Sequence, residues 1–175
     1  MTQYSKRMVI AHWLTLALLI PAWYLGDSLA DATDESKATL TGYIVHIAVG
    51  GTVLLLTLFR FFFRRNDGIP APVGDTTMDK LAKGVHYLLY TVLFVLPVSG
   101  VVILLTSKAG PALLAFDANM LPKEHDYERV FAHEVHEQLV NLLIVLVVIH
   151  ILGAIKHQFI SKDGLMKRMM LRRKD

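Results

Sequence analysis

Apolar residues gather along the chain in four long blocks separated by polar segments. The blocks are 9–26 (VIAHWLTLALLIPAWYLG), 40–63 (LTGYIVHIAVGGTVLLLTLFRFFF), 85–106 (VHYLLYTVLFVLPVSGVVILLT) and 138–155 (QLVNLLIVLVVIHILGAI). Each is close to the ~20 residues that a helix needs to cross the hydrocarbon core of a bilayer. The chain has 175 residues and no evident internal repeat. We therefore predict a single all-α domain over residues 1–175, built as a bundle of four transmembrane helices.

The first block has some features of a secretory signal peptide. Lys6 and Arg7 precede it, and a small-residue motif, ADA, follows at 30–32. The apolar run is longer than the core of an ordinary signal peptide. We therefore expect a retained helix. Pro21 and Pro97 lie inside predicted helices, and membrane helices tolerate proline where neighbouring groups satisfy the freed backbone.

Basic residues are distributed unevenly between the two sides that this topology defines. Of the 18 Lys and Arg residues, 14 lie on the side of the N-terminus, between helices two and three, or in the C-terminal tail. Only four lie on the other side: Lys37, Lys108, Lys123 and Arg129. Because cytoplasmic loops accumulate Lys and Arg, we predict that both termini are cytoplasmic. Contact of the basic segments with anionic lipid explains the surplus of positive charge without a nucleic-acid partner.

Two connecting segments are long. Residues 64–84 contain the proline-punctuated sequence GIPAPVGD, which is typical of a link. Residues 107–129, on the opposite side, contain Pro111 and Pro122. A loop of this length often has a function of its own, and a solvated lid without one is the alternative.

The absence of cysteine narrows the possible chemistry. It excludes disulfides, thiolate catalysis, cysteine-ligated iron–sulfur clusters and covalently attached c-type haem. The segment HEVHE resembles a zinc-protease motif. However, His133 and His136 are three residues apart, whereas that motif needs histidines four apart.

The histidines inside the apolar blocks form the most informative pattern. His150 lies well inside its block, where a polar side chain is costly and usually functional. His136 is 14 residues earlier, which places the two on nearly the same helix face and ~21 Å apart along the axis. His46 matches the depth of His136. At the depth of His150 there are two matching residues, His12 and His86.

Two layers of paired imidazoles from different helices predict two haem groups stacked across the membrane. Neutral imidazole is a good axial ligand for haem iron. A proton channel would also use membrane histidines, often together with carboxylates. No Asp or Glu lies deep in any of the four blocks, which favours haem. A haem-free bundle, with histidines hydrogen-bonded across helices, is the remaining alternative.

Four motifs, in this order and spacing, resemble the bacterial cytochrome b561 family: AHW in the first block, VHIAVGG in the second, VHYLLYTVLFVLPVSG in the third, and HE followed by IHILGAIKH in the fourth. The resemblance covers nearly the whole chain. It implies a four-helix protein of the inner membrane that binds two b haems without covalent attachment. It further implies that His12 and His150 ligate the cytoplasmic-side haem iron, and His46 and His136 the periplasmic-side iron.

Further polar residues are candidates for cofactor contacts. Arg60 either pairs with a haem propionate or extends to the membrane interface. His86 and His157 lie on the predicted cytoplasmic side. They either donate hydrogen bonds to a quinone or are interfacial histidines. Gly50 and Gly51 permit the close approach of a macrocycle or of another helix.

The resemblance also implies an oxidoreductase activity, because the family includes proteins similar to superoxide oxidases. Such a protein passes electrons from periplasmic superoxide to ubiquinone. Arg129, Lys108 and Lys123 are the candidates for an anion landing site. Yet ten Asp and Glu residues against four basic residues make the predicted outer side negative, which repels an anion. A membrane anchor and electron-relay subunit for a periplasmic redox partner, such as a hydrogenase or another cytochrome, is the alternative.

Overall fold

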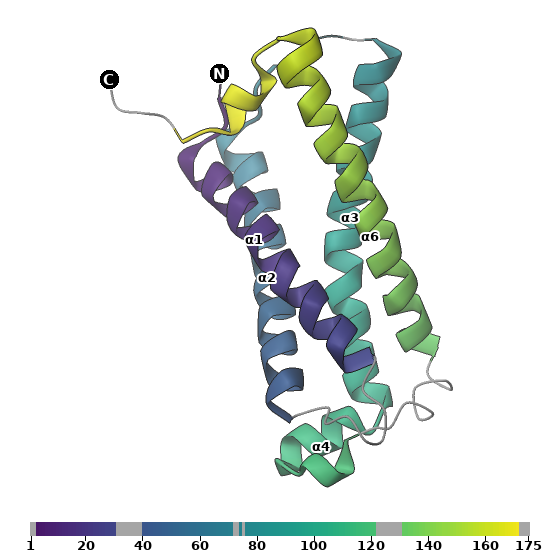
Figure 1. Ribbon diagram of the computed structural model, residues 1–175. Coiled ribbons are helices and arrows are strands. Elements are labelled where there is room, and N and C mark those ends of the chain that lie inside the picture. The colour runs from purple at the N-terminus through teal and green to yellow at the C-terminus, as the bar shows by residue number, and fades with distance from the viewer. Residues whose placement is uncertain (1–2, 31–39, 72–73, 75, 122–130, 172–175) are drawn as a thin grey trace.

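The structure, a computed structural model, describes residues 3–30, 40–71, 74, 76–121 and 131–171. Its elements are α1 (Lys6–Ala30), α2 (Leu40–Asp67), α3 (Thr77–Thr106), α4 (Ala109–Ala115), η1 (Ala118–Met120), α6 (Phe131–Lys156), η2 (His157–Ser161) and η3 (Leu165–Met169). The described residues contain no strand. The long helices run along one another as an elongated bundle (Figure 1).

Four of the described helices are long and apolar enough to cross a membrane: α1, α2, α3, and α6 with its continuation through η2. This confirms the predicted all-α transmembrane bundle. Large apolar side chains such as Ile20, Tyr24 and Phe61 are exposed on its surface. A bundle surrounded by lipid has this composition because hydrocarbon, rather than water, contacts its outer face.

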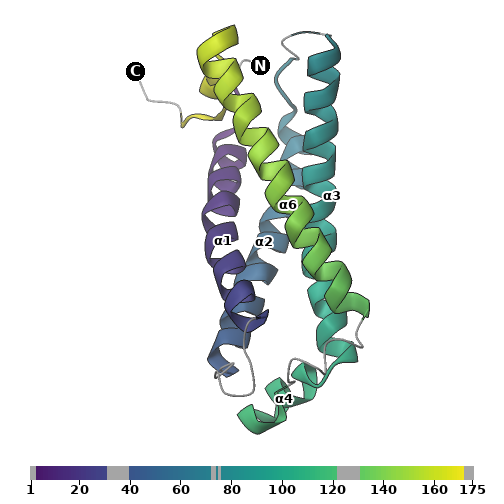
Figure 2. The ribbon, with the colours of Figure 1, turned by 45° about the vertical axis from the view of Figure 1, so that its right-hand side comes forward.

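The four spans pair into two hairpins. Helix α1 packs along α2, and α3 packs along α6, while contacts between the hairpins are fewer. In Figure 2, α1 and α2 lie on the left, α3 lies on the right, and α6 crosses in front of the bundle toward the lower part of α3. Residues from both hairpins form the buried apolar cluster, which consists of Val53, Val85, Val92, Leu93, Leu143 and Leu146. On α6, Leu143 and Leu146 lie between His136 and His150 in the sequence, so apolar side chains separate the two histidine layers.

The helices extend beyond the apolar blocks, and the predicted link 64–84 is therefore too long. Helix α2 continues to Asp67, and α3 begins at Thr77. A capping box starts α3: the Thr76 hydroxyl accepts from the N–H of Asp79, whose carboxylate accepts from the N–H of Thr76. These two bonds satisfy amides that lack partners in the first helical turn.

The second long connector contains a short helix that the sequence pattern did not predict. Helix α4 and the turn η1 occupy 109–120 and lie across one end of the bundle (Figure 1). Helix α4 ends at Ala115, and the C-cap residue Phe116 has a left-handed backbone with φ 52°. Residues 122–130 of this connector lie outside the described part of the chain.

Hydrogen bonds hold the C-terminal segment at the other end. The N–H of Tyr4 donates to the carbonyl of Arg168 at 3.2 Å. The indole N–H of Trp13 donates to the carbonyl of Met169 at 2.8 Å. The Arg168 guanidinium donates to the carbonyl of Ala71 at 2.6 Å. We call this the terminal end of the bundle and the opposite one the α4 end. The described N-terminal and C-terminal segments thus lie at one end of the bundle, and the cytoplasmic location of the termini stays a prediction.

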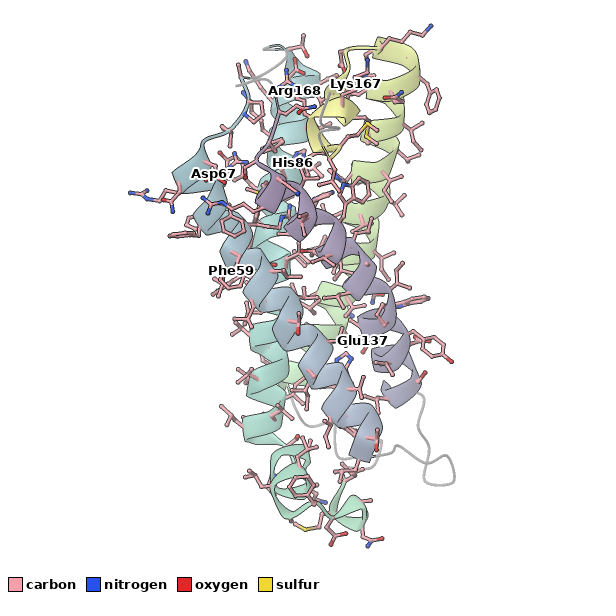
Figure 3. The ribbon with its side chains drawn as sticks, turned by 90° about the vertical axis from the view of Figure 1, so that its left-hand side faces the viewer. Phe59, Asp67, His86, Glu137, Lys167 and Arg168 are labelled. Atoms are coloured by element: carbon pink, nitrogen blue, oxygen red, sulfur yellow. The ribbon has the colours of Figure 1, made fainter. Side chains whose placement is uncertain are left out.

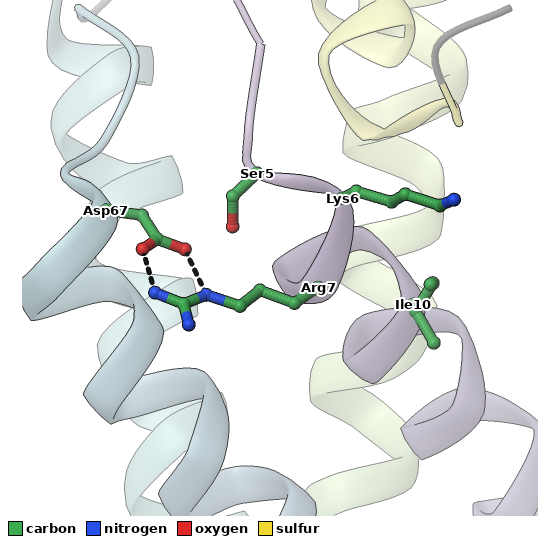
Figure 4. A pocket seen from close by; sticks show the side chains of 5 residues that line it. All are labelled: Ser5, Lys6, Arg7, Ile10 and Asp67. Carbon is green, nitrogen blue, oxygen red and sulfur yellow. Dashed lines mark hydrogen bonds and ion pairs between the residues drawn. The ribbon is translucent and has the colours of Figure 1, made fainter.

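An ion pair also connects α1 and α2 at the terminal end. The Arg7 guanidinium donates two hydrogen bonds to the Asp67 carboxylate and lies over the ring of Phe63, 4.6 Å from its centroid. Figure 4 shows this pair beside an open surface hollow that Ser5, Lys6 and Ile10 also line. No histidine of either pair lines this hollow.

Candidate functional site

The first histidine pair lies toward the α4 end. The rings of His46, in α2, and His136, in α6, have centroids 6.4 Å apart and planes at 67°. Nδ1 of His46 lies 3.1 Å from the carbonyl oxygen of Ala22. Nδ1 of His136 lies 2.9 Å from Oγ of Ser99. Both Nδ1 atoms have hydrogen-bond partners, so the two Nε2 atoms remain for another ligand.

Two glycines make room for these rings. A Cβ atom on Gly26 would lie 3.0 Å from Cε1 of His46, and one on Gly100 would lie 3.4 Å from Cε1 of His136. A helical side chain covers the turn that precedes it. Glycine at these positions therefore leaves the turns with Ala22 and Ser99 open to an imidazole from the neighbouring helix.

The second pair lies toward the terminal end. The rings of His12, in α1, and His150, in α6, have centroids 6.2 Å apart and planes at 64°. His86 of α3 joins this pair, because its ring centroid lies 5.0 Å from that of His150. Nδ1 of His86 donates to the carbonyl of Ala82, one turn back, at 2.6 Å. Figure 3 shows His86 toward the end that carries Asp67, Lys167 and Arg168.

Arg60 brings a positive charge to the terminal-end pair. It interacts electrostatically with His12 and His150, and its guanidinium lies over the ring of Tyr90, 4.9 Å from the centroid. Its Nε atom is buried and has no hydrogen-bond partner in the described structure. A buried donor without a partner is costly. An anion placed here would satisfy it.

The ring separations match those of two imidazoles that share one iron atom. Metal–nitrogen bonds of ~2 Å on either side, with each nitrogen ~1.2 Å from its ring centre, place the centroids about 6.4 Å apart. The two pairs, at 6.4 and 6.2 Å, meet this requirement. The His86–His150 separation of 5.0 Å is too short. Gly50, one turn after His46, has open space where a Cβ would lie. The residues therefore fit bis-histidine haem.

No group of three or more His, Cys, Asp or Glu residues in the described ranges is arranged to hold a metal ion. A model of the family described as prokaryotic cytochrome b561 matches residues 3–171. The chain belongs to the prokaryotic cytochrome b561 family. It is thus a haem b protein of membrane electron transfer and a multi-pass protein of the bacterial inner membrane.

Relatives of known name are similar over nearly their whole lengths. A protein named cytochrome b562 from Cereibacter sphaeroides is 28% identical, over 95% of this chain and 94% of its own. Cytochrome b561 homolog 1 from Escherichia coli is 26% identical, over 99% and 100%. A probable superoxide oxidase, CybB, from Yersinia pestis is 25% identical, over 96% of each chain. These similarities support a cytochrome with a redox role.

Of the remaining predicted site residues, the structure describes Lys108 and His157. Lys108 is exposed and precedes α4, whereas Lys123 and Arg129 are outside the described residues. At the terminal end, Nδ1 of His157 lies 2.5 Å from a carboxylate oxygen of Asp163. Sequence reasoning missed Ser99, Gly26 and Gly100. A glycine shortly after a proline, five residues in PAWYLG and three in LPVSG, is the signal that marks these turns.

Proposed function

We propose that this protein is a di-haem b-type cytochrome that transfers electrons across the membrane from superoxide to ubiquinone. The main support is the pairing of histidines at two depths of the bundle. The ring centroids of the two pairs are 6.2 and 6.4 Å apart. Each pair takes one imidazole from the α1–α2 hairpin and the other from α6. His46 and His136 would hold the haem at the α4 end, and His12 and His150 the haem at the terminal end.

Bound haem would supply one-electron oxidation and reduction of iron. The protein would supply the ligands and the apolar surroundings. The helices hold paired imidazoles across the inter-hairpin space. Apolar residues such as Leu143 and Leu146 exclude water between the layers. The open space beside Gly50 accommodates a macrocycle close to the backbone. Arg60 would donate from its unpaired Nε to a propionate at the terminal end.

Superoxide is the proposed donor at the α4 end, which we assign to the periplasm. Each superoxide loses one electron and becomes O₂, and two electrons with two protons convert one quinone to quinol. Lys108, Lys123 and Arg129 are the proposed basic residues that attract the anion. Likeness to the protein named probable superoxide oxidase supports this donor.

Ubiquinone is the proposed acceptor at the terminal end. His86 and His157 are the proposed residues that bind its carbonyl oxygens. The Nδ1 atom of each ring already has an acceptor, Ala82 or Asp163, so Nε2 would donate to the quinone only when the ring carries a second proton. His86 is exposed and next to His150, so a quinone bound to it would lie near the second redox centre. His157 has a carboxylate partner, Asp163, and that pair is suited to pass a proton to a reduced quinone.

Spectra and haem content of the purified chain test the proposed ligands. We expect two b haems per chain in the dithionite-reduced minus oxidised spectrum. His136→Ala and His150→Ala should each lose one, and the two lost components should differ. His133→Ala, one turn before His136 but in neither pair, is the matched control and should keep both. Retention of both haems in either ligand variant would refute the assignment.

Donor and acceptor are tested separately on the same preparation. Superoxide generated enzymatically should reduce the oxidised haems, and a soluble ubiquinone should reoxidise them. Ferric haem that stays unchanged under a superoxide flux would exclude this donor. Reduced haem that does not respond to quinone would exclude this acceptor.

A relay role for a periplasmic redox protein is the second candidate, and the acidity of the α4 end favours it. The predicted topology assigns ten acidic residues of the sequence, against four basic ones, to this side. Among them, Glu134 and Glu137 are exposed at the start of α6. Such a surface attracts a basic protein and repels an anion. Purification in mild detergent at low salt should then yield a stoichiometric basic partner, whereas full superoxide activity of the chain alone would argue against this role.

A further inference from the structure

Ser99 connects the imidazole of His136 to the backbone of α3. Its side chain is buried, with 7% exposure. Its Oγ lies 2.7 Å from the carbonyl oxygen of Leu96 and 2.9 Å from Nδ1 of His136. The carbonyl can only accept, so the single hydroxyl proton is donated to it. Oγ therefore accepts from Nδ1–H of His136, and the lone pair of that ring is on Nε2.

We propose that Ser99 is a positioning residue that fixes the tautomer of His136 and lowers the reduction potential of the α4-end haem. The inference rests on the proposed assignment of His136 as an axial ligand. Outer-sphere partners of a ligating histidine fix its ring orientation and raise its basicity. The Ser99 oxygen is a stronger acceptor because its hydroxyl donates a hydrogen bond to the Leu96 carbonyl. Hydrogen bonds linked in this way reinforce one another. A more basic ligand favours the ferric state.

The terminal-end pair lacks this arrangement. The rings of His12 and His150 contact other rings, but in the described part of the chain they accept or donate no hydrogen bond. The positive charge of Arg60 acts on them as well. A nearby cation favours the ferrous state. Both effects would give a haem at the terminal end a higher potential than one at the α4 end, and this order would direct electrons toward the proposed quinone side.

A structural role for Ser99, as an ordinary hydrogen bond between α3 and α6, would not change the potential of one haem alone. The test is an equilibrium redox titration of the purified holoprotein and its Ser99→Ala and Ser99→Thr variants. Ser28→Ala is the control, because the Ser28 hydroxyl donates only to the carbonyl of Tyr24 in its own helix. His136→Ala identifies which of the two waves belongs to the α4-end haem.

We expect Ser99→Ala to move that wave to a more positive potential and to leave the other in place. Ser99→Thr, which keeps the hydroxyl, should restore the original value. If Ser99→Ala instead binds this haem 10- to 100-fold more weakly, as loss of an outer-sphere partner can cause, rescue by Ser99→Thr supports the same role. Two bound haems with unchanged potentials in Ser99→Ala would overturn the inference alone. Two retained haems in His136→Ala would instead overturn the ligand assignment.

Discussion

Gly26 of α1 packs directly against the imidazole of His46 in α2, with only 3.0 Å available to a Cβ atom. This contact lets Nδ1 of His46 reach the carbonyl of Ala22. Gly26→Ala would force the ring to move, at a cost of about 1–3 kcal/mol for overpacking. We expect this variant to lose or perturb the α4-end haem and to keep the terminal-end haem, as measured by haem content and redox titration.

Two other glycines provide the comparison. Gly100→Ala should have a weaker effect of the same kind, because its Cβ would lie 3.4 Å from Cε1 of His136. Gly84 is exposed in α3 and has open space around it. Gly84→Ala should therefore keep both haems and increase the stability of α3 by up to ~1 kcal/mol, the difference in helix propensity. Equal haem loss in all three variants would show that Gly26 has no special relation to His46.

Arg60 should affect the other haem. Its guanidinium interacts with both His12 and His150, and its Nε has no partner in the described structure. Arg60→Gln removes the charge. We expect it to lower the potential of the terminal-end haem, because a nearby cation stabilises the ferrous state. Arg64→Gln, one turn further along α2, is the control and should change this potential less. Equal shifts in both variants would mean that Arg60 acts only as one of several interfacial charges.

Helical periodicity predicted the depths at which histidines of different helices face one another, but not the partner of every histidine. Fourteen residues bring His136 and His150 to one face, and the other spans carry matching histidines, so pairing by depth needed no tertiary information. Periodicity left His12 and His86 equivalent. The structure separates them through the ring distances to His150, 6.2 against 5.0 Å. That distinction depends on how α1 and α3 are rotated, which a single sequence does not specify.

The supporting residues were harder to predict for the same reason. Ser99 and Gly100 are ordinary members of an apolar helix until α6 is placed beside them. Helix α4 was missed because its sequence, AGPALLA, is short and contains a proline. The early start of α3 had a visible signal: Thr76 and Asp79 have the spacing of a capping box. Interactions within one helix turn could therefore be predicted from the sequence, whereas contacts between helices could not.

The C-terminal segment should be docked in a pH-dependent way through Asp163. Burial opposes ionisation of this carboxyl, but the hydrogen bonds it accepts from His157 and from the N–H of Leu165 outweigh burial, so its pKa lies below the ordinary 3.8. A carboxylate of this kind stabilises the docked segment above pH 3.8. The stabilisation is lost as the pH falls through the lower, folded-state pKa.

Thiol labelling can measure this docking, because the natural chain has no cysteine. Met169→Cys places one thiol on the residue whose backbone carbonyl accepts a hydrogen bond from the Trp13 indole. In that background, we expect Asp163→Asn to increase the labelling rate at least about tenfold at pH 6, because a charge-assisted hydrogen bond contributes about 1.5–3 kcal/mol. Without Asp163→Asn, labelling by a pyridyl disulfide should accelerate only below pH 3.8. Lys83→Cys, exposed on α3, is the control for the effect of pH on the reagent itself. Labelling rates that change with pH in the same way at positions 83 and 169 would contradict the prediction.

The ion pair of Arg7 and Asp67 should contribute to stability weakly and in a salt-dependent way. Both side chains are near water, where screening reduces a charge pair. The stack of Arg7 on Phe63 is less sensitive to salt. We expect Arg7→Ala to lower the Tm of the detergent-solubilised protein slightly at low salt, and less at high salt. Arg7→Lys should recover only part of the loss, because an ammonium forms neither the two-point bond nor the planar stack.

A double-mutant cycle separates this pair from general charge effects. If the two residues act together, Asp67→Asn added to Arg7→Ala should lower the Tm no further. Arg65→Ala is the control, since Arg65 is exposed near the same end of α2 and forms no ion pair with a described residue. A loss of Tm in Arg65→Ala equal to that in Arg7→Ala would attribute the effect to net charge. A loss confined to Arg7 and Asp67, and suppressed by salt, would show that this contact joins the start of α1 to the end of α2.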